Sequence, residues 1–336
     1  MEKIYDDRVT YKKLLLETQQ RYEDTGDKSL LKDISKYNNI QMAKKISLNS
    51  AYGAVGNNWF RYFDLLVATA ITTSGQLSIR WIEKSLNKYL NKILETEGED
   101  YVIASDTDSV YITFESLVSK VFGESPETSK VVEFLDKVAT DKLEPFINKS
   151  YKSLAELMGA YEQKMVMARE NIADKGIWTA KKRYILNVHD SEGVRYKEPR
   201  LKIMGIEAVK SSTPAPCREK IKECLSIIMA GDEKELNTFI QEFREEFMTL
   251  PPEEIAYPRS CNGLQKWTAD HNLFRKGAPI HVKGGILYNH LLKTNNLENK
   301  YPSIQNGDKI RFLHLRIPNI YQSTAFSFIT DMPREL

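Results

Sequence analysis

Cysteine and histidine are scarce in this sequence, and neither is spaced as a metal site requires. The 336 residues include five histidines and three cysteines, Cys217, Cys224 and Cys261. The cysteines form no CxxC pair and the histidines form no HExxH motif, which are two common signatures of zinc sites. We therefore expect no zinc site, and the low cysteine content fits the reducing cytoplasm.

Long apolar runs are also lacking. No stretch of about 18 apolar residues could span a bilayer, and no basic, apolar and small-residue signal sequence opens the chain. The hydrophobic fraction of 41% and the aromatic fraction of 10% indicate a globular protein. The net charge of +2 selects no class of partner, because a nucleic-acid enzyme can segregate its charges. We expect a cytoplasmic protein without a membrane partner.

The residue patterns predict an α+β fold with a central antiparallel sheet. Apolar residues at helical spacing predict helices over 4–22, 30–53, 65–93 and 131–151, and mostly helical structure over 214–250. Two β-rich runs, 101–104 and 110–114, predict a hairpin with a polar tip. Further strands are expected over 162–169, 182–188 and 307–317.

Two carboxylates, Asp106 and Asp108, lie at the predicted hairpin tip with one residue between them. On an extended chain alternate side chains point to the same face, so the pair can converge, and a cation would relieve its repulsion. Mg²⁺ accepts one or two protein carboxylates and leaves its other positions to phosphate and water. Paired metals promote phosphoryl transfer by activating the attacking oxygen and stabilising the leaving one. The alternative is an ordinary polar turn, because Asp and Thr are common turn residues.

A second pattern places polar and basic residues on one face of a predicted helix. Lys45, Asn49 and Tyr52 lie at i, i+4 and i+7, so they share one face of the helix. On that face Lys suits the phosphates of a nucleoside triphosphate, Asn suits its sugar, and Tyr suits the base pair. Arg8 and Lys12 are spaced by four on the preceding predicted helix. If the two helices are antiparallel, three cations face one polyphosphate, and Arg can bind it through two nitrogens. The alternative is a solvated helix face, with Tyr52 in the core.

A third pattern is the basic run Lys181, Lys182 and Arg183, followed by Tyr184 at a predicted strand start. Consecutive cations beside an aromatic residue suit the phosphate backbone of a duplex, which carries no sequence information. Alternation would place Lys182 and Tyr184 on one face and Arg183 on the other. The alternative is an exposed surface run without function.

Taken together, these segments resemble family B DNA polymerases, in particular the replicative type of large myovirus-like tailed phages. The matching segments are KKISLNSAYGAVGN at 44–57, SDTDSVY at 105–111, KKRY at 181–184, LKIMGIEAVKSSTP at 201–214 and HVKGGILYN at 281–289. The first three resemble the family's motif B, motif C and duplex-checking motif, in the family's order. The resemblance implies a right-hand polymerase fragment with fingers over 1–56, palm over 57–205 and an incomplete, mostly helical thumb over 206–336.

The resemblance also implies residue roles and partners. Metal binding and catalysis are implied for Asp106 and Asp108, and Lys45 would act on the leaving pyrophosphate. Nucleotide binding is implied for Arg8, Lys12, Lys45, Asn49 and Tyr52, and DNA binding for Thr107, Lys181, Lys182, Arg183 and Tyr184. The complete enzyme would use two Mg²⁺ ions, primer–template DNA and deoxynucleoside triphosphates, with a sliding clamp as a further partner. Glu170 matches an auxiliary carboxylate of the family, but Ala168 stands where the family often has a second acid.

Motif A, a DxxSLYP-like segment, and the exonuclease are missing from these 336 residues, and Asp64-Leu65 lacks the SLYP continuation. We therefore expect the carboxy-terminal portion of a DNA-directed DNA polymerase, inactive without an amino-terminal portion. A split gene and a fragment of one longer chain both remain open. If phage-encoded, the protein would work in the host cytoplasm. The alternatives are a non-catalytic, duplex-binding polymerase remnant and another palm nucleotidyltransferase.

Overall fold

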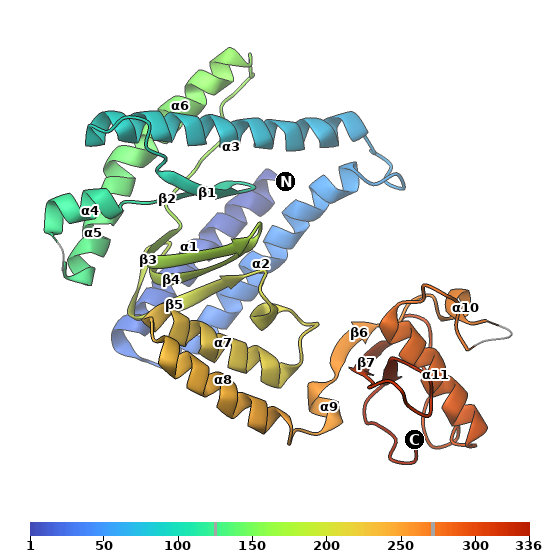
Figure 1. Ribbon diagram of the computed structural model, residues 1–336. Coiled ribbons are helices and arrows are strands. Elements are labelled where there is room, and N and C mark those ends of the chain that lie inside the picture. Colours follow the sequence, from blue (N-terminus) through green and yellow to red (C-terminus); the bar gives the residue numbers. More distant parts are fainter. Residues whose placement is uncertain (124–125, 270–272) are drawn as a thin grey trace. The chain divides into compact units, whose positions relative to one another are not determined.

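The computed structural model describes residues 1–123, 126–269 and 273–336. It divides into two compact units (Figure 1). The first unit comprises Met1–Ile177 and Leu186–Lys202, and the second comprises Trp178–Ile185 and Ile203–Leu336. The main division lies near the expected palm–thumb boundary, whereas the expected fingers and palm share one unit. The three predicted domain boundaries therefore stay predictions.

Two long helices, α1 (Glu2–Thr25) and α2 (Leu30–Val55), pack side by side and run in opposite directions (Figure 1). α1 ends at Gly26, whose φ of 69° is left-handed and whose N–H donates to the carbonyl of Tyr22. Glycine adopts this conformation without strain from a Cβ atom, so α1 ends in the gap between the two predicted helices. The antiparallel pair confirms the two helices expected from apolar spacing.

The core of the first unit forms around α3 (Leu65–Leu94). α3 begins at Asp64, whose carboxylate accepts hydrogen bonds from the backbone N–H groups of Leu66 and Val67. Four side chains spaced by four residues form its buried stripe: Ile82, Leu86, Leu90 and Leu94. They pack against α6 (Glu144–Leu157) and the start of β1 (Val102–Asp106). This stripe confirms the helix that periodicity predicts.

The predicted helix over 131–151 is interrupted. It consists of α5 (Thr128–Val138), a π turn over Ala139–Leu143 and α6, and a short helix, α4 (Glu115–Phe122), precedes it. The side-chain pattern continues across the π turn, which explains why periodicity alone does not reveal the interruption.

Two small sheets form between residues 102 and 204. β1 pairs antiparallel with β2 (Ser109–Ile112), as the hairpin pattern predicts. The next sheet has the order β3 (Asn171–Ala180), β4 (Arg183–Ser191) and β5 (Val194–Met204). The strand predicted over 162–169 is wrong, because the chain is irregular there. The Gln163 side chain bonds both backbone polar groups of Met165, which replaces the pairing of a strand.

Beyond residue 203, the second unit contains a helical hairpin followed by a mixed subdomain. Its helices are α7 (Ala215–Ala230), α8 (Glu233–Phe247), α9 (Pro252–Ile255), α10 (Leu264–Trp267) and α11 (Ile280–Thr294). Its sheet has the antiparallel order β6 (Tyr257–Ser260), β7 (Lys309–His314) and β8 (Ala325–Phe328). β7 confirms the strand expected near 307–317.

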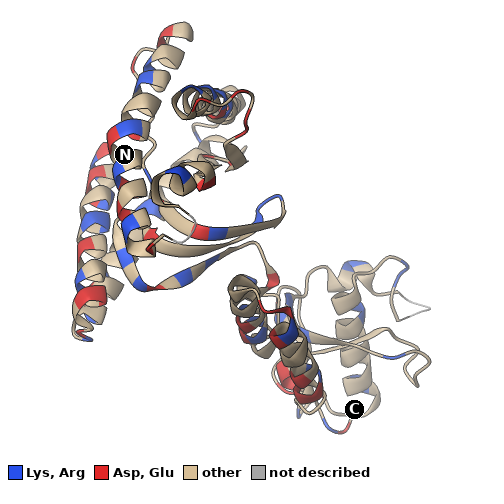
Figure 2. Cartoon of the chain, turned by 60° about the vertical axis from the view of Figure 1, so that its left-hand side comes forward, with Lys and Arg blue, Asp and Glu red and all other residues tan. Residues whose placement is uncertain are grey.

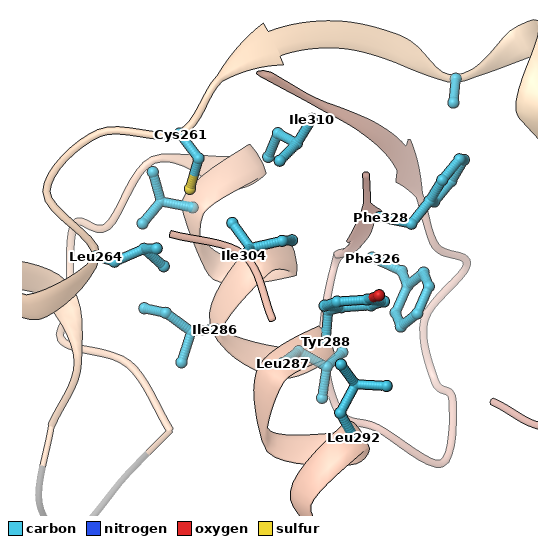
Figure 3. Close-up of a cluster of buried hydrophobic side chains, with 12 residues drawn as sticks. Cys261, Leu264, Ile286, Leu287, Tyr288, Leu292, Ile304, Ile310, Phe326 and Phe328 are labelled. Atoms are coloured by element: carbon cyan, nitrogen blue, oxygen red, sulfur yellow. The ribbon is translucent and has the colours of Figure 1, made fainter. Parts of the chain in front are cut away.

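The core of this subdomain lies between α11 and the β6–β8 sheet (Figure 3). Tyr288 of α11 packs edge-on against Phe326 of β8, and Leu292 and Phe328 are completely buried. At Gly284 a Cβ atom would collide with Ser327, so glycine allows α11 to approach β8 closely. The expected α+β class is confirmed, and the residues that the structure describes form three small sheets rather than one central sheet. Among the described residues, no helix is long and apolar enough to cross a membrane.

Candidate functional site

A pocket of about 340 Å³ lies in the first unit, between α1, α2 and the β4–β5 turn. Arg8 and Lys12 of α1 and Lys45 of α2 all line it. The spacing of four places Arg8 and Lys12 on one face of α1, and the antiparallel packing places Lys45 opposite them. The structure therefore brings together the three cations that the sequence predicts for a polyphosphate. We call this the cationic pocket.

Contacts along α1 keep this pocket in place. Gln20 accepts a hydrogen bond of 2.8 Å from the backbone N–H of Arg195 in β5, and Glu23 pairs with Arg200. Between α1 and α2, Lys44 pairs with Asp7 at 2.6 Å, and this hydrogen bond lowers the pKa of the Asp7 carboxyl. α1 is thus tied to both α2 and β5.

Arg8 has an unsatisfied polar group in the cationic pocket. Its Nε atom is buried and has no hydrogen-bond partner within the described ranges. A buried N–H without a partner is unfavourable, and an anionic oxygen would satisfy it with a strong, charge-assisted bond. The pocket is therefore suited to an anionic ligand.

Two carboxylates, Glu170 and Glu192, also line the pocket. Glu192 forms an ion pair with Lys12, and Glu170 accepts a bond of 2.6 Å from Lys202. Burial alone would raise the pKa of Glu170, but hydrogen bonds from Lys202 and Asn171 and nearby positive charge lower it overall. Figure 2 shows both signs of charge distributed along α1 and α2. The wall of the pocket is therefore mixed, not purely basic.

Sequence reasoning missed Glu192. The run Asp190-Ser191-Glu192-Gly193 is a recognisable turn signal at the end of a predicted strand. Its ion pair with Lys12 joins residues 180 positions apart, so no local pattern could reveal it.

Asn49 and Tyr52 lie on α2 beyond Lys45, at the helical spacing that the sequence predicts. Both are exposed and neither lines the cationic pocket. Tyr52 is 43% exposed, so the alternative of a core aromatic residue is wrong. Their roles stay predictions.

The acidic hairpin differs in detail from the expected geometry. Asp106 ends β1 and pairs with Ser109, while Thr107 and Asp108 form a two-residue turn. Thr107 has a left-handed φ of 57°, and its hydroxyl donates to Asp106 Oδ1 over 3.0 Å. Extended alternation therefore does not apply to Asp108, because tight hairpins require positive φ in the turn. Within the turn, the N–H of Asp108 donates to the Asp106 carbonyl over 2.7 Å.

Asp108 is exposed and Asp106 is half-buried. Burial, and secondarily the charge of Asp108, raises the pKa of the Tyr151 phenol on α6. Two carboxylate groups are the hard oxygen donors that Mg²⁺ prefers, so the pair fits part of a magnesium site. Across the residues that the structure describes, no group of three or more His, Cys, Asp or Glu could hold a metal. Glu170 thus forms no such group with the hairpin, and the remaining ligands would be phosphate, water or another segment.

The basic run lies at a hairpin tip. Lys181 and Lys182 connect β3 to β4, and Lys182 has a left-handed φ of 63°. The expected alternation from Lys182 onward is therefore wrong, because only Arg183 and Tyr184 belong to the strand. The turn raises Lys181 and Lys182 clear of the strand, and both are exposed.

Tyr184 is buried, and its expected role in DNA binding stays a prediction. It is 5% exposed, and its ring stacks on Trp178 with centroids 6.3 Å apart. Arg183 forms an ion pair with Glu207. Gly205 faces the Lys182 carbonyl so closely that a Cβ atom would collide with it. These contacts hold the basic tip in place.

Comparison with known proteins identifies relatives. The model of DNA polymerase family B matches residues 1–261. The "DNA-directed DNA polymerase" of Escherichia phage RB69 is 41% identical over 310 residues, which cover 88% of this chain and 34% of that protein. The "DNA-directed DNA polymerase" of Enterobacteria phage T4 is 36% identical over 330 residues, 94% of this chain and 36% of that protein. A "DNA polymerase beta" of African swine fever virus is 29% identical over 178 residues, 51% of this chain and 14% of that protein. The chain spans about a third of the length of the two phage relatives.

Proposed function

This chain belongs to DNA polymerase family B, and we propose that it supplies the fingers, most of the palm and part of the thumb of a DNA-directed DNA polymerase. The reaction is template-directed transfer of a deoxynucleotide from its triphosphate to a primer 3′-hydroxyl, with release of pyrophosphate. The observation that carries this proposal is the convergence of Arg8, Lys12 and Lys45 on one pocket.

In this proposal the cationic pocket binds the triphosphate of the incoming nucleotide. Arg8 offers its unpartnered Nε and the rest of its guanidinium to two phosphate oxygens. Lys12 and Lys45 neutralise further charge, and Lys45 stabilises the pyrophosphate as it leaves. Asn49 and Tyr52, farther along α2, serve the sugar and the nascent base pair.

Asp106 and Asp108 provide two carboxylates for Mg²⁺. When bound, two Mg²⁺ ions activate the primer hydroxyl and neutralise charge on the reacting phosphate. Thr107 fixes the Asp106 carboxylate through its hydroxyl and sits at the tip that faces the primer. Further ligands come from outside these residues, in line with the share of the relatives that the chain covers.

The basic tip contacts the duplex product. Lys181 and Lys182 bind phosphates without regard to sequence. Arg183 and Tyr184 position this tip through Glu207 and Trp178. The complete enzyme includes an amino-terminal portion that contributes motif A and the exonuclease, and its partners are primer–template DNA, nucleotides and a sliding clamp.

A chimeric enzyme tests the proposal. This chain replaces the matching 34% of the RB69 phage polymerase, and primer extension is measured with all four nucleotides. We expect templated extension that Asp108→Ala reduces by about 10²-fold or more, while the exposed control Glu97→Ala leaves it unchanged. A folded chimera that binds primer–template DNA but does not extend it contradicts the proposal.

The isolated 336-residue chain provides a second measurement. We expect it to bind nucleotide but to extend no primer, because its two carboxylates provide only part of the metal site. Extension by the isolated chain that Asp108→Ala abolishes would show that no further portion is needed.

A further inference from the structure

The ion pair between Lys12 and Glu192 lies in the pocket proposed to bind phosphate. Both side chains are about one-third exposed, 34% for Lys12 and 32% for Glu192. Partial removal from water strengthens such a pair relative to one on an open surface. Glu192 therefore already pairs with Lys12, one of the three cations that a polyphosphate would contact.

The backbone holds Glu192 firmly in this position. Its N–H donates to the carbonyl of Glu170 over 2.6 Å, and the next N–H, of Gly193, donates to Asp190 Oδ1 over 2.9 Å. Asp190 is completely buried. The carboxylate of Glu192 is thus presented by a fixed turn, not by a loose loop.

The turn itself disfavours glutamate. Glu192 has a φ of 53° and Gly193 a φ of 91°, so both turn residues are left-handed. Gly or Asn is preferred at the first position of such a turn, because Gly has no Cβ atom to strain the backbone and the short Asn side chain can form local hydrogen bonds. Glu192 nevertheless occupies this strained position, from which its carboxylate contacts Lys12.

We propose that Glu192 is an internal counter-ion that competes with phosphate for Lys12 and so weakens the binding of every phosphate ligand that takes this cation. The inference rests on the proposed nucleotide site. A triphosphate contacts Arg8 and Lys45 while it displaces Glu192 from Lys12, so its other contacts offset the broken pair.

Glu170, the other carboxylate of the pocket, differs in this respect. Lys202 of β5 already neutralises it at 2.6 Å, and Lys202 does not line the pocket. The charge of Lys12 also lowers the pKa of Glu170, but only as the smallest cause, and the direct ion pair of Lys12 is with Glu192.

Calorimetric titration of the chain with inorganic tripolyphosphate and with inorganic phosphate tests the inference. We expect Glu192→Gln to bind tripolyphosphate about fivefold more tightly, the value of one moderately strong ion pair. Its affinity for inorganic phosphate should rise by no more than this factor, because phosphate loses the same competitor. The matched control Glu198→Gln removes the same charge from exposed β5 and should change neither affinity.

A second variant isolates the pair. In Lys12→Met, the further change Glu192→Gln should raise tripolyphosphate affinity by less than it does in the wild type, because no ion pair remains to be broken and only the repulsion by the carboxylate is removed. Wild-type and Glu192→Gln proteins that bind tripolyphosphate equally would overturn the counter-ion role while leaving the proposed pocket intact.

A ligand-free readout separates failure of the pair from failure of the site. The rate at which an acetylating reagent modifies Lys12, followed by mass spectrometry, should rise in Glu192→Gln but not in Glu198→Gln, because a paired amine must first leave its carboxylate. A raised rate with no tripolyphosphate binding by any variant would refute the nucleotide pocket and, with it, the competition with phosphate. An unchanged rate would refute the pair itself.

Discussion

The guanidinium of Arg169 donates a hydrogen bond to the carboxylate of Asp190, which is completely buried. Arg169 also donates to Asp136 of α5 over 2.6 Å. Burial alone would lower the pKa of Arg169, but the hydrogen bond to Asp136 and the charge of Asp190 raise it overall. Arg169 directly precedes Glu170, and Asp190 lies two residues before Glu192. This buried network therefore positions the acidic wall of the cationic pocket.

Removal of the buried carboxylate should destabilise the fold. In Asp190→Ala, Arg169 loses one partner and the N–H of Gly193 loses its acceptor. We expect the free energy of unfolding to fall by about 3 kcal/mol, as for other broken buried ion pairs. Urea denaturation followed by circular dichroism measures it. Arg195→Ala, which removes a 45% exposed partner of the same network, should cost less than about 1 kcal/mol, and equal costs would argue against the network.

Lys45→Ala should weaken nucleotide binding selectively. Loss of one charge-assisted hydrogen bond, worth about 1.5–3 kcal/mol, predicts at least about tenfold weaker binding of a deoxynucleoside triphosphate. Affinity for a labelled primer–template duplex should stay unchanged. Calorimetry and fluorescence anisotropy measure the two affinities. Lys32→Ala serves as the control, since Lys32 lies on α2 outside the pocket, and equal weakening of nucleotide and DNA binding would contradict the role of Lys45.

The features that the sequence predicts well depend on local periodicity. The buried stripe of α3 repeats every four residues, and the antiparallel α1–α2 pair follows from two periodic segments around a glycine turn. Helical spacing of four also places Arg8 and Lys12 on one side of α1, facing Lys45. The three cations of the site could therefore be found before the fold was known.

Features that depend on turn geometry or distant contacts could not be found in this way. Thr107 and Lys182 adopt left-handed backbone in two-residue turns, which ends the alternation assumed for Asp108 and Tyr184. The burial of Tyr184 comes from Trp178 across the hairpin. The pair of Lys12 with Glu192 joins distant segments. Pairing partners of this kind are set by tertiary packing, on which local residue patterns carry little information.

The basic tip should contribute to the salt dependence of DNA binding. Each phosphate contact releases counter-ions and adds about 0.9 to the slope of log K against log salt. Lys181→Ala combined with Lys182→Asn should therefore reduce the slope by about 1.8 without changing sequence preference. Asn is chosen because it tolerates the left-handed φ of 63° at position 182. Fluorescence anisotropy over a range of salt concentrations measures the slope, and an unchanged slope would exclude this tip from phosphate contact.

The pair that holds this tip should be sensitive to acid. Glu207 accepts hydrogen bonds from Lys210 and Arg183. These bonds, with that from Lys210 as the largest cause, lower the pKa of Glu207 from an ordinary 4.5 to about 2. A carboxylate with a depressed pKa in the folded state stabilises the protein at pH above about 4.5, and this contribution is lost as the pH falls toward 2.

Glu207→Gln should therefore lose less stability than the wild type between pH 6 and pH 3. Because solvent screens this exposed pair, we expect the difference to stay below about 1 kcal/mol and to shrink at high salt. Urea unfolding at each pH, in low and high salt, measures it. Glu219→Gln removes the same charge from exposed α7 and should follow the wild type more closely. If wild type and Glu207→Gln lose stability in parallel on acidification, Glu207 does not anchor Arg183, and the packing of Tyr184 and the close approach of Gly205 must hold the basic tip.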